Sequence, residues 1–394
     1  MATGDYIDPT LIGPETLAGQ YLRRFWHPVF RAEDLVPGSA VPLRVLGVEF
    51  TLYRGGGGAA HMLPFRCAHR ASQLNTGWVE DDTLRCFYHG WRYDGSGQCV
   101  EQPGEDPAFA QRVKLPSWPV QEYLGLIFAY FGPGDPPALP RYPEFEAPGV
   151  LDAYPPEYWP CSYFNRIDNA ADAAHLSFAH RESRNAIGRP QPLPQVTAEE
   201  TEYGVLTSLV VNGAVRSTLH FHMPNINQFI QTDTRLRDPL NPNAPAAMAR
   251  LLFRVPIDDE SCVSFPIDHV SLTGEVGAAY LERRRRLEAA QQAAPQSPEA
   301  MGDLVLRSRM RVAEVRERDS ANLKTLTSVE DYVAQVGQGP RVHHPTERLG
   351  RMDEGIILIR NIWQRELRAF AEGHPLKSWT RREPLGQPRV GRRS

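Results

Sequence analysis

Apolar and polar positions divide the chain into a β-rich first part and a mixed second part. Between about residues 30 and 130, short runs of branched and aromatic residues, such as 42–53, alternate with glycines and prolines. This pattern is typical of short strands joined by tight turns. Glycine and proline then crowd residues 132–160, which predicts a crossing between two domains or, alternatively, a long surface loop within one domain.

The second part mixes helices and strands. Residues 168–179 are rich in alanine and predict a helix, whereas 203–275 return to a strand pattern. Further helices are expected over 278–293, 299–325 and 353–371. The tail from Arg381 onward is expected to be disordered.

Composition narrows the class of protein. The 394 residues carry a formal net charge of −4, so neither nucleic acid nor an anionic membrane is an expected partner. No apolar run is long enough to span a membrane, and the start lacks the basic and apolar regions of a secretory signal. A cytoplasmic protein is therefore expected. The 5 cysteines are too few, and odd in number, for a disulfide framework.

Two cysteine–histidine pairs form the first candidate site: Cys67 with His69, and Cys86 with His89. Two thiolates and two imidazoles can hold a tetrahedral zinc ion. They can also hold a [2Fe–2S] cluster in which two cysteines bind one iron and two histidines bind the other. The single residue between Cys67 and His69 is a tighter spacing than that of common zinc-finger pairs, which favours the cluster.

The second candidate site has the pattern N-x₂-D-x₂-H-x₄-H over residues 169–180. Asp172 and His175 are three residues apart and would share one face of a helix. His180 would lie about 140° around the helix from His175, so the helix must widen into a π-type turn or end between them for both to reach one metal. Two histidines and a carboxylate form the facial triad of non-haem Fe(II) oxygenases. On its own, this histidine pair would more often be incidental.

The missing carboxylate must come from far downstream. The candidates are Asp319, Glu330, Asp331 and Asp353. Any one of them, taken alone, is by default a solvated surface charge.

Together the two patterns resemble a known family. Residues 65–70 (FRCAHR) and 86–94 (CFYHGWRYD) are similar to the two boxes of Rieske proteins, C-x-H-R and C-x-Y-H-G-W. Nearly the whole chain resembles the oxygenase (alpha) component of Rieske non-haem iron aromatic ring-hydroxylating oxygenases, in the phthalate dioxygenase-type branch. The likeness extends to segments 21–28, 120–130, 255–260 and 347–353.

The resemblance implies an α+β fold. A β-rich Rieske domain would span 29–150, and a catalytic domain would span 151–394, with 1–28 packed on it. The catalytic domain would have an antiparallel sheet gripping a long helix, as in the START-like helix-grip folds. Respiratory Rieske subunits carry an extra cysteine in each box, and here Ala71, Ser72 and Tyr88 stand at those places. The resemblance therefore points to a low-potential cluster that receives electrons.

The resemblance also implies site residues and partners. It makes Cys67, His69, Cys86 and His89 the cluster ligands. It makes His175, His180 and Asp331 the ligands of a mononuclear Fe(II), because segment 329–340 resembles the family segment in which the aspartate ligand begins a helix. A flavin and plant-type ferredoxin reductase would pass electrons from NAD(P)H.

The family ring implies a trimer, or a dimer of trimers. In such a ring one subunit's cluster lies beside its neighbour's iron. Asp172 would bridge His89 of one subunit and His175 of the next, accepting an N–H from each imidazole. Its default interpretation is a charge on a helix surface.

Other histidines and arginines carry weaker signals. His220 and His222 point to one face of a strand and either line the pocket or are buried core residues. His27, His343 and His344 are interpreted as structural or surface residues. An anionic substrate would need an arginine, and the candidates are Arg181, Arg184, Arg216, Arg235, Arg237 and Arg254.

Three functions compete. The leading one is a terminal oxygenase that uses O₂ and reductase-supplied electrons to mono- or dioxygenate an aromatic compound, with an aromatic acid as the expected substrate. Oxidative O-demethylation or aryl-ether cleavage is the alternative within the family. A Rieske electron-transfer protein with a ligand-binding domain is the rival from another class, and a zinc-binding structural protein is the third. A carrier would not need His175, His180 and a carboxylate.

Overall fold

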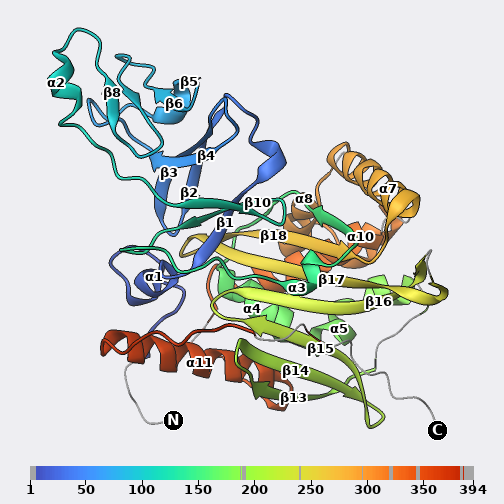
Figure 1. Ribbon diagram of the computed structural model, residues 1–394. Coiled ribbons are helices and arrows are strands. Elements are labelled where there is room, and N and C mark those ends of the chain that lie inside the picture. The colour runs from blue at the N-terminus through green and yellow to red at the C-terminus, as the bar shows by residue number, and fades with distance from the viewer. Residues whose placement is uncertain are drawn as a thin grey trace.

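The structure is a computed structural model (Figure 1). It describes residues 6–186, 188, 192–238, 241–294, 296–318, 323–342, 347–381 and 385. The side chains of 231–238, 241–246, 317–318 and 323–324 are outside this description. Among the residues considered above, Asp319, His343, His344 and the side chains of Arg235 and Arg237 therefore lie outside the described residues, as does all of the tail after Arg381 except Leu385.

Three small antiparallel sheets form the first part of the chain (Figure 1). Their strands are β1 (Trp26–Arg31), β10 (Leu126–Tyr130) and β9 (Val120–Tyr123); β2 (Ala40–Val45), β3 (Val48–Arg54) and β4 (Ala60–Pro64); and β5 (Trp78–Glu80), β6 (Thr83–Arg85), β7 (Arg92–Tyr93) and β8 (Cys99–Glu101). The apolar run 42–53 is a hairpin, because Leu46 and Gly47 have φ of 51° and 76° and turn the chain. The predicted β-rich first part is confirmed.

An eight-stranded antiparallel sheet forms the centre of the second part. Its strands, in spatial order, are β11 (Val150–Ala153), β18 (Ser261–Val270), β17 (Asn241–Asp258), β16 (Ile226–Asp238), β15 (Ala214–His222), β14 (Gly204–Val211) and β13 (Gln195–Glu200), with β12 (Glu157–Trp159) also paired to β18. Alternate residues face opposite sides. On one side, Leu219 packs with Ala173 and Leu176, so this side of the sheet faces the segment that carries the candidate iron ligands.

Helices cover this sheet (Figure 1). Their bounds are α1 (Leu17–Leu22), α4 (Tyr163–Ala171), α5 (His175–Phe178), α6 (Arg181–Ala186), α7 (Gly274–Gln292), α8 (Pro298–Leu306), α9 (Val312–Arg318), α10 (Leu323–Val336) and α11 (Glu354–Ala371), and the short turns α2 (Pro107–Ala110) and α3 (Pro143–Glu146) lie elsewhere. Long α11 runs across β13 and β14, and a Cβ at Gly355 would lie 2.5 Å from Oγ1 of Thr207. The absence of a side chain there lets the helix lie directly on the sheet.

The range 299–325, expected as one helix, contains α8, α9 and the start of α10. α8 ends at Leu306 and α9 begins at Val312, with the intervening Ser308 at φ 56°. The breaks let α8 and α9 fold back on α10, where Met301, Val315 and Val329 share a small apolar core. The helix expected over 353–371 is confirmed as α11. No helix within the described ranges combines the length and the apolar character needed to cross a bilayer.

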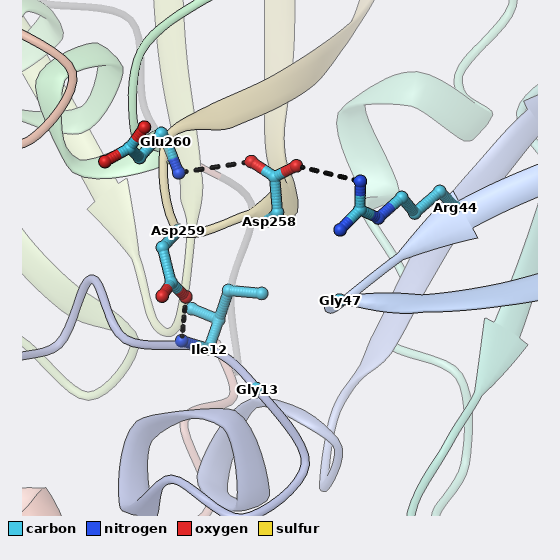
Figure 2. Close-up of a pocket in the computed structure, with 7 residues that line it drawn as sticks. All are labelled: Ile12, Gly13, Arg44, Gly47, Asp258, Asp259 and Glu260. Carbon is cyan, nitrogen blue, oxygen red and sulfur yellow. Dashed lines mark hydrogen bonds and ion pairs between the residues drawn. The ribbon is translucent and has the colours of Figure 1, made fainter.

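The turn between β17 and β18 joins the first part of the chain to the large sheet (Figure 2). Asp258 pairs with Arg44 at 3.3 Å, and Oδ1 of Asp259 accepts the N–H of Ile12 at 2.8 Å. The N–H of Gly47 also donates to the carbonyl of Ile257 at 2.8 Å. These residues line the pocket drawn in Figure 2, and their polar groups hold three chain segments together.

The N-terminal segment contacts both parts of the chain. Tyr21 of α1 packs edge-on against Trp363 of α11. β1, however, pairs with β10 and crosses the expected boundary at residue 29. The fold is therefore α+β as predicted, and the division at residues 29 and 150 remains a prediction.

Candidate metal centres

Two loops of the same construction carry the first four candidate residues. Cys67 follows β4 and Cys86 follows β6. In each loop the cysteine carbonyl accepts the N–H of the fourth residue on, Ala71 or Gly90, at 3.0 Å. The cysteine N–H donates to the carbonyl of the residue after that, at 2.9 and 2.8 Å. Ala71 and Gly90 both adopt left-handed backbone, with φ of 57° and 73°, so one backbone turn is built twice.

This repeated turn places thiols inside and imidazoles outside. Cys67 and Cys86 are buried, whereas His69 and His89 are exposed with ring centroids 4.6 Å apart. The ring of His69 stacks on Trp91 at 4.5 Å and 7°. Trp91 is itself buried and so covers one side of the loop pair. The four side chains form two Cys–His pairs at one tip of the molecule.

The spread of these four side chains favours a cluster over a single ion. A tetrahedral zinc site brings its four donor atoms close around one centre. Within the part of the chain that the structure describes, no three of these four residues bring donor atoms as close together as one ion requires. A [2Fe–2S] cluster spreads its ligands over two irons. The donor set and its spacing therefore fit the cluster.

The segment that carries the second candidate site is not one continuous helix. The helix predicted over 168–179 ends at Ala171, and Asp172 is extended, with ψ of 127°. Oδ1 of Asp172 instead accepts the N–H of Ala174 at 2.7 Å. This cap starts a new helix and leaves Oδ2 of Asp172 3.6 Å from Nδ1 of His175. The predicted proximity holds, but a capping turn produces it rather than a shared helix face.

A π-type turn joins His175 and His180. The carbonyl of His175 accepts both the N–H of Ala179, at 2.8 Å, and that of His180, five residues on, at 3.3 Å. This is the widening that the spacing required. The two rings lie 5.2 Å apart between centroids.

Asp331 lies with the two histidines in one group of residues that could hold a metal ion. The donor atoms of His175, His180 and Asp331 all lie within 4.8 Å of one another, and Oδ1 of Asp331 is 3.6 Å from Nε2 of His180. Asp331 lies in the second half of α10, so the expectation that it begins a helix is wrong. Of the rival carboxylates, Asp353 accepts the N–H of Gly350 at the start of α11.

Sequence patterns missed the groups that hold Asp331. Its Oδ1 accepts from the side-chain amides of Asn169 at 3.1 Å and Gln335 at 3.2 Å. Gln335 in turn accepts from Nη1 of Arg166 at 2.6 Å. Asn169 is the first residue of the pattern N-x₂-D-x₂-H-x₄-H, and Gln335 lies one helical turn after Asp331. Both positions could therefore have been predicted from the sequence to lie near the candidate ligands.

Charge at this site is unbalanced without a cation. Asp172, Glu330 and Asp331 have no lysine or arginine within ion-pair distance among the described side chains. Burial disfavours a charged His180, but its hydrogen bond to Glu330 and the charges of Asp331 and Glu330 outweigh this and raise the pKa of His180. Burial likewise opposes the ionisation of Asp172, but His175 and the capping amides lower the pKa of Asp172. Two imidazoles beside uncompensated carboxylates are the chemistry of a divalent-metal site.

His220 and His222 lie on the opposite side of the sheet from Leu219 and so face away from this site. His220 is buried and bonds to the hydroxyls of Tyr203, at 2.8 Å, and Thr218, at 3.1 Å. His222 is buried and stacks on Tyr203 at 4.5 Å. They are core histidines. His27 is also fully buried and donates to the carbonyl of Leu22 at 2.8 Å.

The arginine candidates separate by burial. Arg181 and Arg216 are exposed, and Arg184 is half-buried. Arg254 is 3% exposed and donates to Oγ of Ser264 at 2.6 Å. Burial, and then the like charge of Arg166, lower the pKa of Arg254 to about 9. A contact of any of them with substrate remains a prediction.

The two candidate centres lie in different regions of one chain: the cysteine loops border β5–β8, whereas His175 begins α5 and His180 lies between α5 and α6, and these elements are well separated in Figure 1. Within the described part of one chain, His89 and Asp172 form no ion pair. The first part therefore presents two exposed histidines, and the second part holds a centre in which His180 is buried and His175 and Asp331 are half-buried.

A β-rich domain with two Cys–His loops, joined to a helix-covered antiparallel sheet, defines a Rieske-type iron–sulfur oxidoreductase. Residues 25–123 match the Rieske [2Fe-2S] domain. The oxygenase subunit of 5,5'-dehydrodivanillate O-demethylase from Sphingobium sp. is 27% identical, over 93% of this chain and 80% of that protein. The oxygenase subunit of tert-butanol monooxygenase / tert-amyl alcohol desaturase from Aquincola tertiaricarbonis is 26% identical, over 93% and 77%.

Among solved structures, the terminal oxygenase of carbazole 1,9a-dioxygenase from Nocardioides aromaticivorans has the same fold. Its TM-score is 0.64 at 19% identity, covering 92% of this chain and 96% of that one. The chain thus carries a Rieske [2Fe-2S] domain, is similar over most of its length to the oxygenase (alpha) subunits of Rieske aromatic oxygenases, and is an oxidoreductase that incorporates O₂.

Proposed function

We propose that this chain is the terminal oxygenase of a multicomponent system that oxygenates a small aromatic compound, with an aromatic acid as the substrate class. The observation that supports this most is the convergence of His175, His180 and Asp331 in a chain that also carries the two Cys–His loops. An electron carrier needs the loops alone. The second set of ligands is what an oxygenase adds.

In this proposal Cys67, His69, Cys86 and His89 hold a [2Fe–2S] cluster, and His175, His180 and Asp331 hold Fe(II). The iron supplies O₂ activation when bound. The protein's part is to present two neutral imidazoles and one carboxylate on one side, and to orient Asp331 through the amides of Asn169 and Gln335.

The substrate class is supported by the name of the Sphingobium relative, an O-demethylase of 5,5'-dehydrodivanillate, an aromatic acid. Oxidative O-demethylation is accordingly the alternative to ring hydroxylation here. The Aquincola relative is named for an aliphatic alcohol, which makes aliphatic alcohols the competing substrate class.

We further propose the partners and assembly. Electrons would come from a flavin and plant-type ferredoxin reductase, and three chains would form a ring, alone or as a pair of rings. In that ring the exposed His89 of one subunit would meet Asp172 of its neighbour. The chain would divide into a Rieske domain at 29–150 and a catalytic domain at 151–394, with 1–28 packed on the latter. We expect it in the cytoplasm.

A single-turnover experiment tests the proposal. The holoprotein, with its cluster reduced beforehand, is mixed with ¹⁸O₂ and one of three probes: benzoate, a methoxybenzoate or tert-butanol. Ring hydroxylation puts ¹⁸O on the ring. O-Demethylation consumes O₂, two electrons and two protons, and releases the phenol, formaldehyde and water, leaving the ring oxygen unlabelled.

We expect product from an aromatic acid in the wild type and none from Asp331→Ala, whose cluster should still reduce normally. Oxidation of the cluster with no product from any probe, and equal peroxide from both proteins, would instead support the electron carrier. Product from tert-butanol alone would overturn the aromatic class but not the oxygenase.

A further inference from the structure

We infer that Glu330 is a positioning residue of the iron site: its carboxylate fixes the proton of His180 on Nδ1, so that Nε2 is free to bind the metal. This inference rests on the proposed iron site. From the sequence alone, Glu330 is one of the four candidate carboxylate ligands, as an alternative to Asp331. The structure gives it a different place.

Glu330 is buried against the outer edge of His180. Its Oε2 lies 3.1 Å from Nδ1 of His180, and its Oε1 accepts the backbone N–H of Ser183 at 3.0 Å. The side chain of Glu330 is 0% exposed, and that of His180 is 6% exposed. The carboxylate thus ties α10 to the first turn of α6, directly after the ligand histidine.

Two consecutive residues of one helix address the two nitrogens of one imidazole. Glu330 and Asp331 point about 100° apart around α10. Glu330 meets Nδ1 of His180, and Asp331 lies 3.6 Å from its Nε2. If Nδ1 carries the proton and donates to Glu330, Nε2 presents its lone pair to the side where Asp331 and His175 supply the other ligand atoms.

A glutamate is required because two donors must be accepted. The N–H of Ser183 is always a donor, and Nδ1–H of His180 is the second. A carboxylate accepts both, but a glutamine has one oxygen and one NH₂. In Glu330→Gln the oxygen would be held by Ser183, and the NH₂ would face Nδ1. His180 would then carry its proton on Nε2, which cannot bind a metal.

Burial without a basic partner supports the same role. A buried carboxylate is costly unless it is paired, and Glu330 has no lysine or arginine within ion-pair distance among the described side chains. The cost of burying the Glu330 carboxylate must therefore be offset by its hydrogen bond to the His180 imidazole and by the metal that this imidazole would bind. A carboxylate that hydrogen-bonds a ligand histidine raises the basicity of that ligand and fixes its ring.

The experiment compares Glu330→Gln, Glu330→Asp and a matched control, Glu366→Gln. Glu366 is a buried glutamate on α11 that accepts from Arg365 and does not touch the site. Each purified protein is loaded with Fe(II), and its affinity is measured by competition with a ferrous chelator. The EPR spectrum of the nitric oxide adduct of the Fe(II) protein reports ligand geometry, and the Rieske visible spectrum reports folding.

Glu330→Gln should bind Fe(II) about 10- to 100-fold more weakly than the wild type, with an intact Rieske spectrum. Glu330→Asp keeps the charge but is one methylene shorter. It should recover most of the affinity while altering the nitric oxide spectrum, because the ring must rotate to reach it. Glu366→Gln should match the wild type in both measurements.

Wild-type affinity and an unchanged nitric oxide spectrum in Glu330→Gln would overturn the inference. If that variant does not fold, the same two results in Glu330→Asp would overturn it. Retention of iron in Asp331→Asn alongside loss in Glu330→Gln would make Glu330 a ligand and overturn it too. The His180→Ala variant distinguishes failure of the Glu330 inference from failure of the iron site on which it rests. Wild-type iron binding in His180→Ala would refute the proposed iron site itself.

Discussion

Asp331 and His180 lie far apart in the sequence, yet Oδ1 of Asp331 is 3.6 Å from Nε2 of His180. They meet because α10 packs against α4 and α6, and because a π-type turn carries His180 round to the side of His175. The two residues form the core of the proposed iron site.

The hydroxyl of Tyr93 lies 3.2 Å from Sγ of Cys67, in the core beneath the cluster loops. A hydrogen bond to a ligand sulfur stabilises the extra negative charge of the reduced cluster. Tyr93→Phe should therefore lower the reduction potential of the cluster, by an amount on the order of tens of millivolts, measured by redox titration of the Rieske EPR signal.

Tyr53→Phe is the matched control, because Tyr53 is buried in the same core but donates to the carbonyl of Asp82. Its potential should equal that of the wild type. Equal potentials for all three proteins would show that the Tyr93 hydroxyl does not act on the cluster.

Asp172→Asn tests the proposed route between subunits. The amide keeps the size but cannot accept N–H groups through two oxygens. Iron and cluster should both remain, and the cluster should reduce normally, while product from a single turnover falls by orders of magnitude. Wild-type rates of cluster oxidation and product formation in this variant would refute Asp172 as the bridge. A monomer in solution would equally refute the ring.

The buried histidines predict a pH-dependent stability. Burial, and then the charge of Arg381, lower the pKa of His220 to about 4 and that of His222 to about 3. Both are depressed below the ordinary value near 6.5, so the unfolded chain gains protons first as pH falls. Their contribution is complete above about pH 6.5 and is lost progressively as pH falls, down to about pH 4 for His220 and about pH 3 for His222, by about 1–2 kcal/mol per histidine at pH 5.

Chemical denaturation between pH 7.5 and 5 checks this. His220→Gln should flatten the loss of stability with falling pH, whereas His374→Gln, at an exposed site after α11, should not. Parallel pH profiles for the wild type and His220→Gln would contradict the assignment.

Local sequence signals predicted the parts of the molecule that depend on near neighbours. The β-rich first part follows from glycine-punctuated strand patterns, although the turn at Leu46 and Gly47, which makes the run 42–53 a hairpin, was not predicted. Helix geometry alone requires either a π-type turn or a helix end between His175 and His180, and the structure has both: the His175 carbonyl accepts the N–H of His180, and α5 ends at Phe178.

Tertiary packing decided what the sequence could not. The break at Asp172 was missed, because the preference of alanine for helix conceals a capping carboxylate. The position of Asp331 late in α10 depends on the packing of α8 and α9. The separate role of Glu330 arises because adjacent helix residues point about 100° apart, so Glu330 and Asp331 face different nitrogens of His180. Sequence spacing could not tell which residue faces which nitrogen, because it does not place His180.

The ratio of iron to acid-labile sulfide, measured on wild type and Asp331→Ala, tests the central claim most directly. A Rieske cluster contributes two irons and two sulfides per chain, and a mononuclear site adds one iron. We predict about three irons per two sulfides in the wild type, and about two per two in Asp331→Ala with its Rieske spectrum unchanged. Two irons per two sulfides in the wild type after loading with Fe(II), with no difference between the two proteins, would contradict a second metal centre and the oxygenase with it.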